Sequence, residues 1–130
     1  MKKLIWILLA ILVLTACGQD KENKQEAAYV NITAQQAKEI MDSQEGYIIL
    51  DTRTQEEYDE GHIPGAILIP YDEILEKAES MLTDKDQLIL VYCRSGRRSK
   101  LAAEDLQKLG YTNIKEFGGI IDWKYEVEAC

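Results

Sequence analysis

The sequence predicts an α/β domain with a mainly parallel central sheet flanked by helices. Short, continuously apolar runs are typical of strands buried on both faces, and several occur along the chain. Helical patterns lie between these runs, and such alternation is typical of parallel strands joined by helices. The chain has 130 residues, which is enough for one domain of this kind and little more.

In the first half of the domain, residues typical of helix and strand ends occur where the spacing of apolar residues also predicts that an element begins or ends. Thr33 is the expected N-cap of a helix, and Thr54 with Glu57 three residues later forms a capping box for a shorter helix. Gly61 ends that short helix, and Pro70 stops the strand after it. The expected elements are a helix over 34–43, a strand over 47–50, a short helix between 54 and 61, a turn over 62–65, a strand over 66–69 and a helix over 71–81.

The second half contains a strongly apolar strand and a long helical pattern. Gly110 is the expected C-cap of that helix. The expected elements are a strand over 88–92, a loop that begins at Cys93, a helix that extends to Leu109, a strand over 113–117, a turn over 118–119 and one or two helical turns over 120–125. We therefore place the domain at residues 30–130.

The loop that begins at Cys93 is the most chemically distinctive stretch. Its residues are Cys93, Arg94, Ser95, Gly96, Arg97 and Arg98, and Ser99 follows. A tight loop between a strand and a helix directs backbone N–H groups and the positive end of the helix dipole towards its centre. Such surroundings lower the pKa of a thiol and also bind an oxyanion. The alternative is a buried structural cysteine beside a solvated basic surface.

A second polar stretch, 51–53, follows the strand over 47–50. Sites in open parallel sheets form beyond the carboxyl ends of the strands, so Asp51 and Arg53 are expected near the cysteine loop. We expect Asp51 to accept hydrogen bonds from backbone N–H groups. We expect Arg53 to bridge to Glu57 or to the cysteine loop. Both are predicted to support the site.

Three stretches together resemble the rhodanese (thiosulfate sulfurtransferase) homology domain over roughly residues 32–125. They are Asp51-Thr52-Arg53 continuing to Gly61-His62-Ile63-Pro64-Gly65-Ala66, the loop from Cys93 to Arg98, and Gly118-Gly119 followed by Trp123. Sulfurtransferases of this family have a six-residue loop from the cysteine, as here. Related phosphatases and arsenate reductases have a seven-residue loop with arginine at the last position, which is Ser99 in this chain.

The resemblance implies a sulfurtransferase that moves sulfur from thiosulfate or a similar donor to a thiol or cyanide acceptor through a persulfide on Cys93. It implies substrate binding by Arg94, Ser95, Gly96, Arg97 and Arg98, and support from Asp51, Arg53 and Ser99. Arg98 has an open alternative as a structural ion pair with an acidic side chain. The alternative function is a sulfur-carrier, sensing or protein-binding module with little turnover.

The first residues are typical of a bacterial lipoprotein signal. Two lysines precede an apolar run over 4–14 that is too short to span a membrane, and Leu14-Thr15-Ala16-Cys17 resembles a lipobox. We expect residues 1–16 to be a signal peptide, Cys17 to carry lipid and residues 17–29 to form a flexible tether. The domain is then lipid-anchored on the outer face of the cytoplasmic membrane or faces a periplasm.

Composition limits the remaining possibilities. The formal net charge of -8 argues against nucleic acid as a partner. His62 is the only histidine, and no dinucleotide or P-loop motif is present, so we expect no metal and no cofactor. We expect a monomer. Cys130 is either an ordinary terminal residue or a resolving thiol for Cys93.

Overall fold

Five parallel strands form the central sheet in the computed structural model, which describes residues 29–130. They are β1 (Val30–Asn31), β2 (Ile48–Asp51), β3 (Ile67–Leu68), β4 (Ile89–Cys93) and β5 (Ile114–Gly119). Their order in the sheet is β1-β5-β4-β2-β3, and every neighbouring pair is parallel. The predicted α/β fold with a mainly parallel sheet is confirmed.

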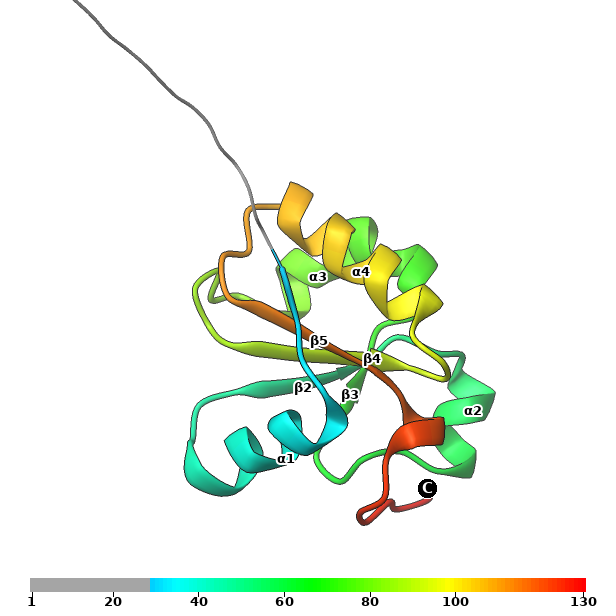
Figure 1. Cartoon of the computed structure of the whole chain (residues 1–130). Helices are drawn as coiled ribbons and strands as arrows, with labels where there is room; N and C mark the ends of the chain where they lie inside the picture. Colours follow the sequence, from blue (N-terminus) through cyan, green and yellow to red (C-terminus); the bar gives the residue numbers. More distant parts are fainter. Residues whose placement is uncertain (1–28) are drawn as a thin grey trace, which may run out of the picture.

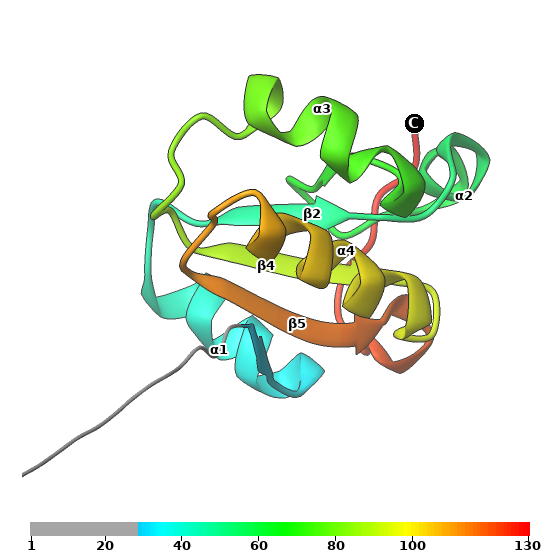
Figure 2. The ribbon, with the colours of Figure 1, turned by 90° about the horizontal axis from the view of Figure 1, so that it is seen from above.

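Helices cover both faces of this sheet. They are α1 (Ala34–Ser43), α2 (Gln55–Glu60), α3 (Ile74–Met81) and α4 (Arg97–Lys108). Helices α3 and α4 lie over one face and α1 over the other, while α2 lies beside the carboxyl ends of the strands (Figures 1 and 2). Each face has its own apolar cluster, with Leu50, Val91 and Leu106 in one and Ile49, Leu90 and Phe117 in the other. Because successive side chains of a strand point to opposite faces of the sheet, the same buried strands contribute to both clusters.

Both predicted N-caps are present. The Thr33 hydroxyl accepts the N–H of Gln36, and the Gln36 side chain accepts the N–H of Thr33. Thr54 and Glu57 form the same reciprocal pair at α2, and Gly61 ends that helix. These caps satisfy backbone N–H groups that have no partner inside their helices.

The structure corrects several element boundaries. The helix expected over 71–81 begins as a 3-10 turn, Tyr71–Glu73, because Glu73 leaves helical geometry before α3 begins. The turn expected over 118–119 is the end of β5, and a single 3-10 turn, Ile120–Asp122, follows it. Strand β1 was not predicted. It has two residues, and β5, with which it pairs, lies far away in the sequence.

The expected signal peptide, the lipidation of Cys17 and nearly all of the tether fall on residues 1–28, outside the described residues. Within residues 29–130, no helix combines the length and the apolar character that crossing a membrane requires.

Candidate active site

The predicted nucleophile is the last residue of the central strand. Strand β4 ends at Cys93, whose side chain is buried, and α4 begins at Arg97. Gly96 caps that helix with φ of 110°, in the left-handed region that favours glycine. Its N–H donates to Cys93 Sγ over 3.0 Å. The loop therefore brings a backbone N–H group to the sulfur.

Opposing influences act on the thiol. Burial raises the pKa of Cys93, because a charged sulfur is poorly solvated there. Nearby polar groups outweigh burial: they are the Ser99 hydroxyl and the backbone N–H groups of Ser99, Gly96 and Ser95, of which the Gly96 N–H is at hydrogen-bonding distance from the sulfur. The pKa of Cys93 therefore lies below its ordinary value, and the site favours the thiolate.

The end of β5 packs closely against the backbone of the cysteine loop. A Cβ atom on Gly119 would lie 1.9 Å from the Arg94 carbonyl oxygen and 2.5 Å from the Ser95 nitrogen. The Ile121 N–H donates to that same carbonyl over 3.2 Å. Only glycine at residue 119 allows so close an approach, which explains why Gly119 accompanies the cysteine loop.

Ser99, expected as a supporting residue, is buried in the first turn of α4. Its buried hydroxyl donates towards the carboxylate of Glu116 on β5 and also lies 3.0 Å from the Gly96 carbonyl oxygen. Glu116 was not identified from the sequence. The available signal was a charged residue two positions after Ile114 in a short strand, and therefore on the same buried face.

Asp51 and Arg53 form a buried pair beside the loop. Asp51 Oδ1 accepts the backbone N–H of Arg53, and the guanidinium binds both carboxylate oxygens, with Nη2 2.6 Å from Oδ2. The Tyr92 hydroxyl donates to Asp51 Oδ2 over 2.7 Å. The Thr52 hydroxyl and N–H both donate to the Tyr92 carbonyl. This network fixes the residue that precedes Cys93.

The expected bridge from Arg53 to Glu57 or to the cysteine loop is wrong, because the Arg53 side chain binds Asp51 and residue 61. Arg53 Nη2 donates instead to the Gly61 carbonyl over 2.7 Å. Glu57 binds Arg98, with the two guanidinium nitrogens 2.8 and 3.1 Å from its carboxylate oxygens. Arg98 thus occupies the structural ion pair that the sequence left open, and it adds positive charge near Cys93.

This ion pair predicts an acid-dependent loss of stability. The Arg98 hydrogen bonds lower the pKa of Glu57 to about 2 despite burial, which raises it. Because the pKa of Glu57 is lower in the folded protein than its unfolded value of 4.5, ionised Glu57 stabilises the fold fully above pH 4.5. This stabilisation is lost as the pH falls through about 2. With partial solvent screening, we expect a loss of about 1–3 kcal/mol of unfolding free energy across that window.

Urea unfolding at pH values between these limits measures the effect. Glu57→Gln keeps the capping box but removes the charge, so its stability is expected to vary less with pH in this window. Parallel curves for the two proteins would contradict the assignment.

Three predicted site residues face solvent at the loop. Arg94, Ser95 and Arg97 are exposed, and the Arg97 guanidinium lies 5.7 Å from the centre of the Tyr71 ring. Their substrate contacts stay predictions.

The C-terminal segment is attached beside α2. His62 pairs with Glu128 through two backbone hydrogen bonds of 2.8 Å, and its ring stacks on Tyr58 with a centroid distance of 3.8 Å. The Cys130 N–H donates to the Asp59 carbonyl over 3.1 Å. Cys93 and Cys130 are both free thiols, with Cys130 exposed. The backbone of Cys130 is therefore hydrogen-bonded, and a resolving role for its thiol stays a prediction.

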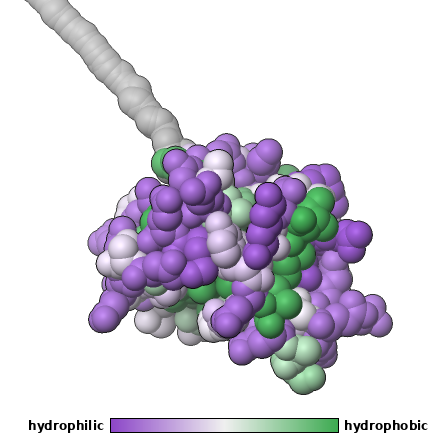
Figure 3. Space-filling view, turned by 60° about the horizontal axis from the view of Figure 1, so that its bottom comes forward, coloured by the Kyte–Doolittle hydropathy of each residue, from purple (hydrophilic) through white to green (hydrophobic). Residues whose placement is uncertain are grey.

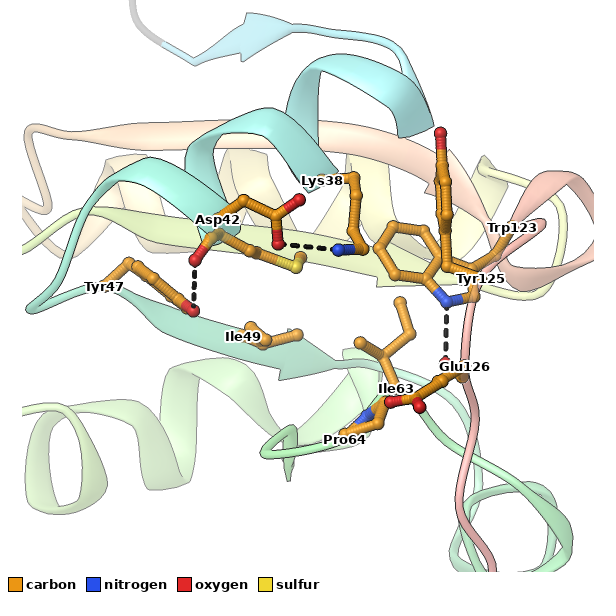
Figure 4. A pocket seen from close by; sticks show the side chains of 10 residues that line it. Lys38, Asp42, Tyr47, Ile49, Ile63, Pro64, Trp123, Tyr125 and Glu126 are labelled. Carbon is orange, nitrogen blue, oxygen red and sulfur yellow. Dashed lines mark hydrogen bonds and ion pairs between the residues drawn. The ribbon is translucent and has the colours of Figure 1, made fainter.

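A separate hollow of about 530 Å³ lies between α1 and the C-terminal segment (Figure 4). Its apolar lining includes Met41, Ile63 and Trp123, and the ion pair of Lys38 and Asp42 lies at its rim. Figure 3, in which the lower face of Figure 1 is turned forward, shows a strip of apolar side chains on that face. None of the predicted site residues lines this hollow. Within residues 29–130, no group of three or more His, Cys, Asp or Glu side chains is arranged to hold a metal ion.

Comparison with known proteins agrees with this geometry. Residues 33–126 match the family model described as Rhodanese-like domain. A Bacillus subtilis protein named "Putative sulfur carrier protein YrkF" is 35% identical over 112 residues, or 85% of this chain, which spans only 60% of that relative. Thiosulfate sulfurtransferase PspE of Escherichia coli is 40% identical over 73 residues, covering 56% of this chain and 70% of PspE.

A solved structure titled "rhodanese with anions from E. coli" has the same fold. It superposes with a TM-score of 0.61 and 34% sequence identity, covering 65% of this chain and 99% of the other.

Proposed function

This chain belongs to the rhodanese-like domain family, and from that premise we propose that it transfers sulfane sulfur from thiosulfate or a similar donor through a persulfide on Cys93. The observation that carries the proposal is the loop around the sulfur. A buried thiol with a lowered pKa accepts the Gly96 N–H, and further backbone N–H groups face it. A site of this kind stabilises negative charge on sulfur.

The first half-reaction is a nucleophilic displacement. The Cys93 thiolate attacks the outer sulfur of thiosulfate, an S–S bond forms to Cys93, and the donor S–S bond breaks. Sulfite leaves with the electron pair. The persulfide anion then lies in the loop, where N–H groups stabilise its charge as they would an oxyanion.

The second half-reaction restores the enzyme. A thiophilic acceptor, such as cyanide or a thiolate, attacks the outer persulfide sulfur, and the Cys93 thiolate leaves. Splitting the transfer into two displacements replaces one difficult step by two easier ones.

Arginine side chains supply the charge for the donor. Arg94 and Arg97 are exposed at the loop and are the groups we assign to the donor sulfonate. Arg98 acts from its pair with Glu57, where it holds the loop and contributes long-range positive charge.

Intact-mass spectrometry of the full chain in detergent tests the proposal. After thiosulfate treatment, we expect a gain of one sulfur atom, which cyanide removes as thiocyanate. Cys93→Ser is expected to abolish the gain completely, because no other residue is proposed to carry sulfur. Cys130→Ser is the matched control and is expected to keep it. A folded protein with free Cys93 that gains no sulfur would refute thiosulfate transfer.

The second candidate is a sulfur carrier with little turnover. The observation that favours it is the burial of Cys93, which is 1% exposed and limits access for large acceptors. A carrier would gain sulfur stoichiometrically and release it to a protein thiol, but it would turn over slowly with cyanide. The rate of thiocyanate formation therefore separates the two functions.

We further propose that residues 1–17 direct the domain to the outer face of the cytoplasmic membrane, anchored by lipid on Cys17. The support is the order of basic residues, apolar run and cysteine in the sequence. Labelling with a radioactive fatty acid tests this, and incorporation into a Cys17→Ala chain would refute it.

A further inference from the structure

The only histidine of the chain lies where the C-terminal segment, residues 124–130, is attached to the rest of the domain. The ring of His62 is buried and stacks on the Tyr58 ring of α2, with the two planes parallel to within 1°. Its nitrogens face different groups. Nδ1 lies 2.8 Å from the Tyr58 carbonyl oxygen, and Nε2 lies 3.3 Å from Glu128 Oε2. A carbonyl oxygen and a carboxylate can only accept hydrogen bonds, so both nitrogens face acceptors.

These two contacts select one protonation state of the ring. A neutral imidazole carries hydrogen on one nitrogen and a lone pair on the other. With hydrogen on Nδ1, the lone pair of Nε2 faces the Glu128 carboxylate. With hydrogen on Nε2, the lone pair of Nδ1 faces the Tyr58 carbonyl. Either neutral form sets two acceptors against each other, whereas the imidazolium donates from both nitrogens and attracts the charge of Glu128.

The C-terminal segment buries little surface of its own. All of residues 124–130 are exposed. The backbone of Glu128 exchanges two hydrogen bonds with His62, and the Cys130 N–H donates to the Asp59 carbonyl. The Trp123 indole donates to the Glu126 carbonyl over 2.9 Å. Segments with few buried contacts open locally at a small free-energy cost, so a single ion pair strongly changes how often this one opens.

We propose that His62 is a proton-dependent latch for the C-terminal segment: the protonated ring holds Glu128, and loss of the proton loosens residues 124–130. The sign follows from linkage, because the latched arrangement needs the proton and the open one does not. The latch therefore opens as the pH rises through the range in which imidazoles change charge, about pH 5 to 8. Tyr125 and Glu126 line the apolar hollow, so opening removes one of its sides (Figure 4). This inference does not depend on the proposed sulfur transfer.

Other titratable and charged groups surround the ring. Burial raises the pKa of Tyr58 and of the Cys130 thiol, so both stay neutral between pH 5 and 8. The Arg53 guanidinium binds the carbonyl of residue 61 and is already paired with a carboxylate. The groups that the variants below leave unchanged are Tyr58 and Asp59 on α2, Arg53 with its partner Asp51 at the end of β2, Tyr92 on β4, and Cys130 with its terminal carboxylate.

The test is hydrogen exchange of the full chain in detergent, with millisecond labelling and mass spectrometry of the peptide that contains residues 124–130. Protection factors correct for the pH dependence of exchange in an open chain. Between pH 5.5 and pH 8.0, we expect protection of this peptide to fall about tenfold, which corresponds to a one-unit difference in pKa between latched and open states.

Glu128→Gln distinguishes the latch from a general effect of pH. The glutamine amide donates to a neutral Nε2 and accepts from a protonated one, so protection is expected to be nearly equal at the two pH values. Glu126→Gln is the matched control, because it removes a carboxylate from the same segment without touching His62, and it is expected to behave like the wild type. Equal protection of the wild type at both pH values would overturn the proposal, and so would a tenfold fall that persists in Glu128→Gln.

Discussion

Gly119→Ala is expected to slow persulfide formation on Cys93 by about a hundredfold, because a catalytic group misplaced by about 1 Å can cost that much. The added methyl would lie 1.9 Å from the Arg94 carbonyl oxygen, and the nearest contacts are all backbone atoms. No side chain can rotate away, so the loop itself must move. We also expect a loss of about 1–3 kcal/mol of unfolding free energy from overpacking.

Gly61→Ala is the matched control for this substitution. Both glycines have extended backbones, with φ of -138° at Gly119 and 168° at Gly61, but a Cβ on Gly61 would meet nothing within 4 Å. We expect its stability and its rate of persulfide formation to stay close to those of the wild type. Stopped-flow measurement of sulfite release after mixing with thiosulfate gives the rate. If Gly119→Ala behaves like Gly61→Ala, the close contact between β5 and the loop is not required.

Asp51→Asn is expected to lower the free energy of unfolding by about 3–5 kcal/mol, the usual cost of removing one partner of a buried ion pair. Asp51 is fully buried and the Arg53 side chain is 6% exposed. The substitution leaves the guanidinium buried without a counter-ion, and it weakens the acceptor of the Tyr92 hydroxyl. Because Tyr92 precedes Cys93, a slower reaction at the loop should accompany the loss of stability.

The comparison for Asp51→Asn is the same substitution at an exposed ion pair. Asp42 lies 2.6 Å from Lys38 on the surface of α1, and Asp42→Asn should cost about 0.5 kcal/mol or less. Urea denaturation of the three proteins measures both values. Equal losses at the two positions would show that burial of the Asp51 pair contributes little to stability.

Elements that depend on local patterns were predicted well from the sequence. The continuously apolar strands β2 and β4, the N-cap at Thr33 and the capping box at Thr54 depend on neighbouring residues, and the structure contains them. Strand β1 was missed because two residues carry no period, and its pairing depends on a distant strand. The contact of His62 with Glu128 could not be predicted for the same reason, because the two residues are far apart in the sequence.

The candidate site shows the same division. The chemistry of the cysteine loop could be predicted, because the strand, the glycine and the arginines are adjacent in the sequence. The partner of Arg98 could not, because several carboxylates were available and only the placement of α2 selects Glu57. The contact of Glu116 with Ser99 could not be predicted either, because the two residues lie on different elements, β5 and α4.

The order of strands also affects how the domain assembles. Strand β5 lies between β1 and β4, although it is the last strand to be synthesised. Asn31 on β1 reaches its partner Glu116 across 85 residues of sequence. Contacts of such long range slow folding, because the ends of a long loop must first meet. The packing of β5 against the Cys93 loop therefore forms only after the residues of β5 have been synthesised. Until then, the thiol is accessible to oxidants and to wrong disulfide partners.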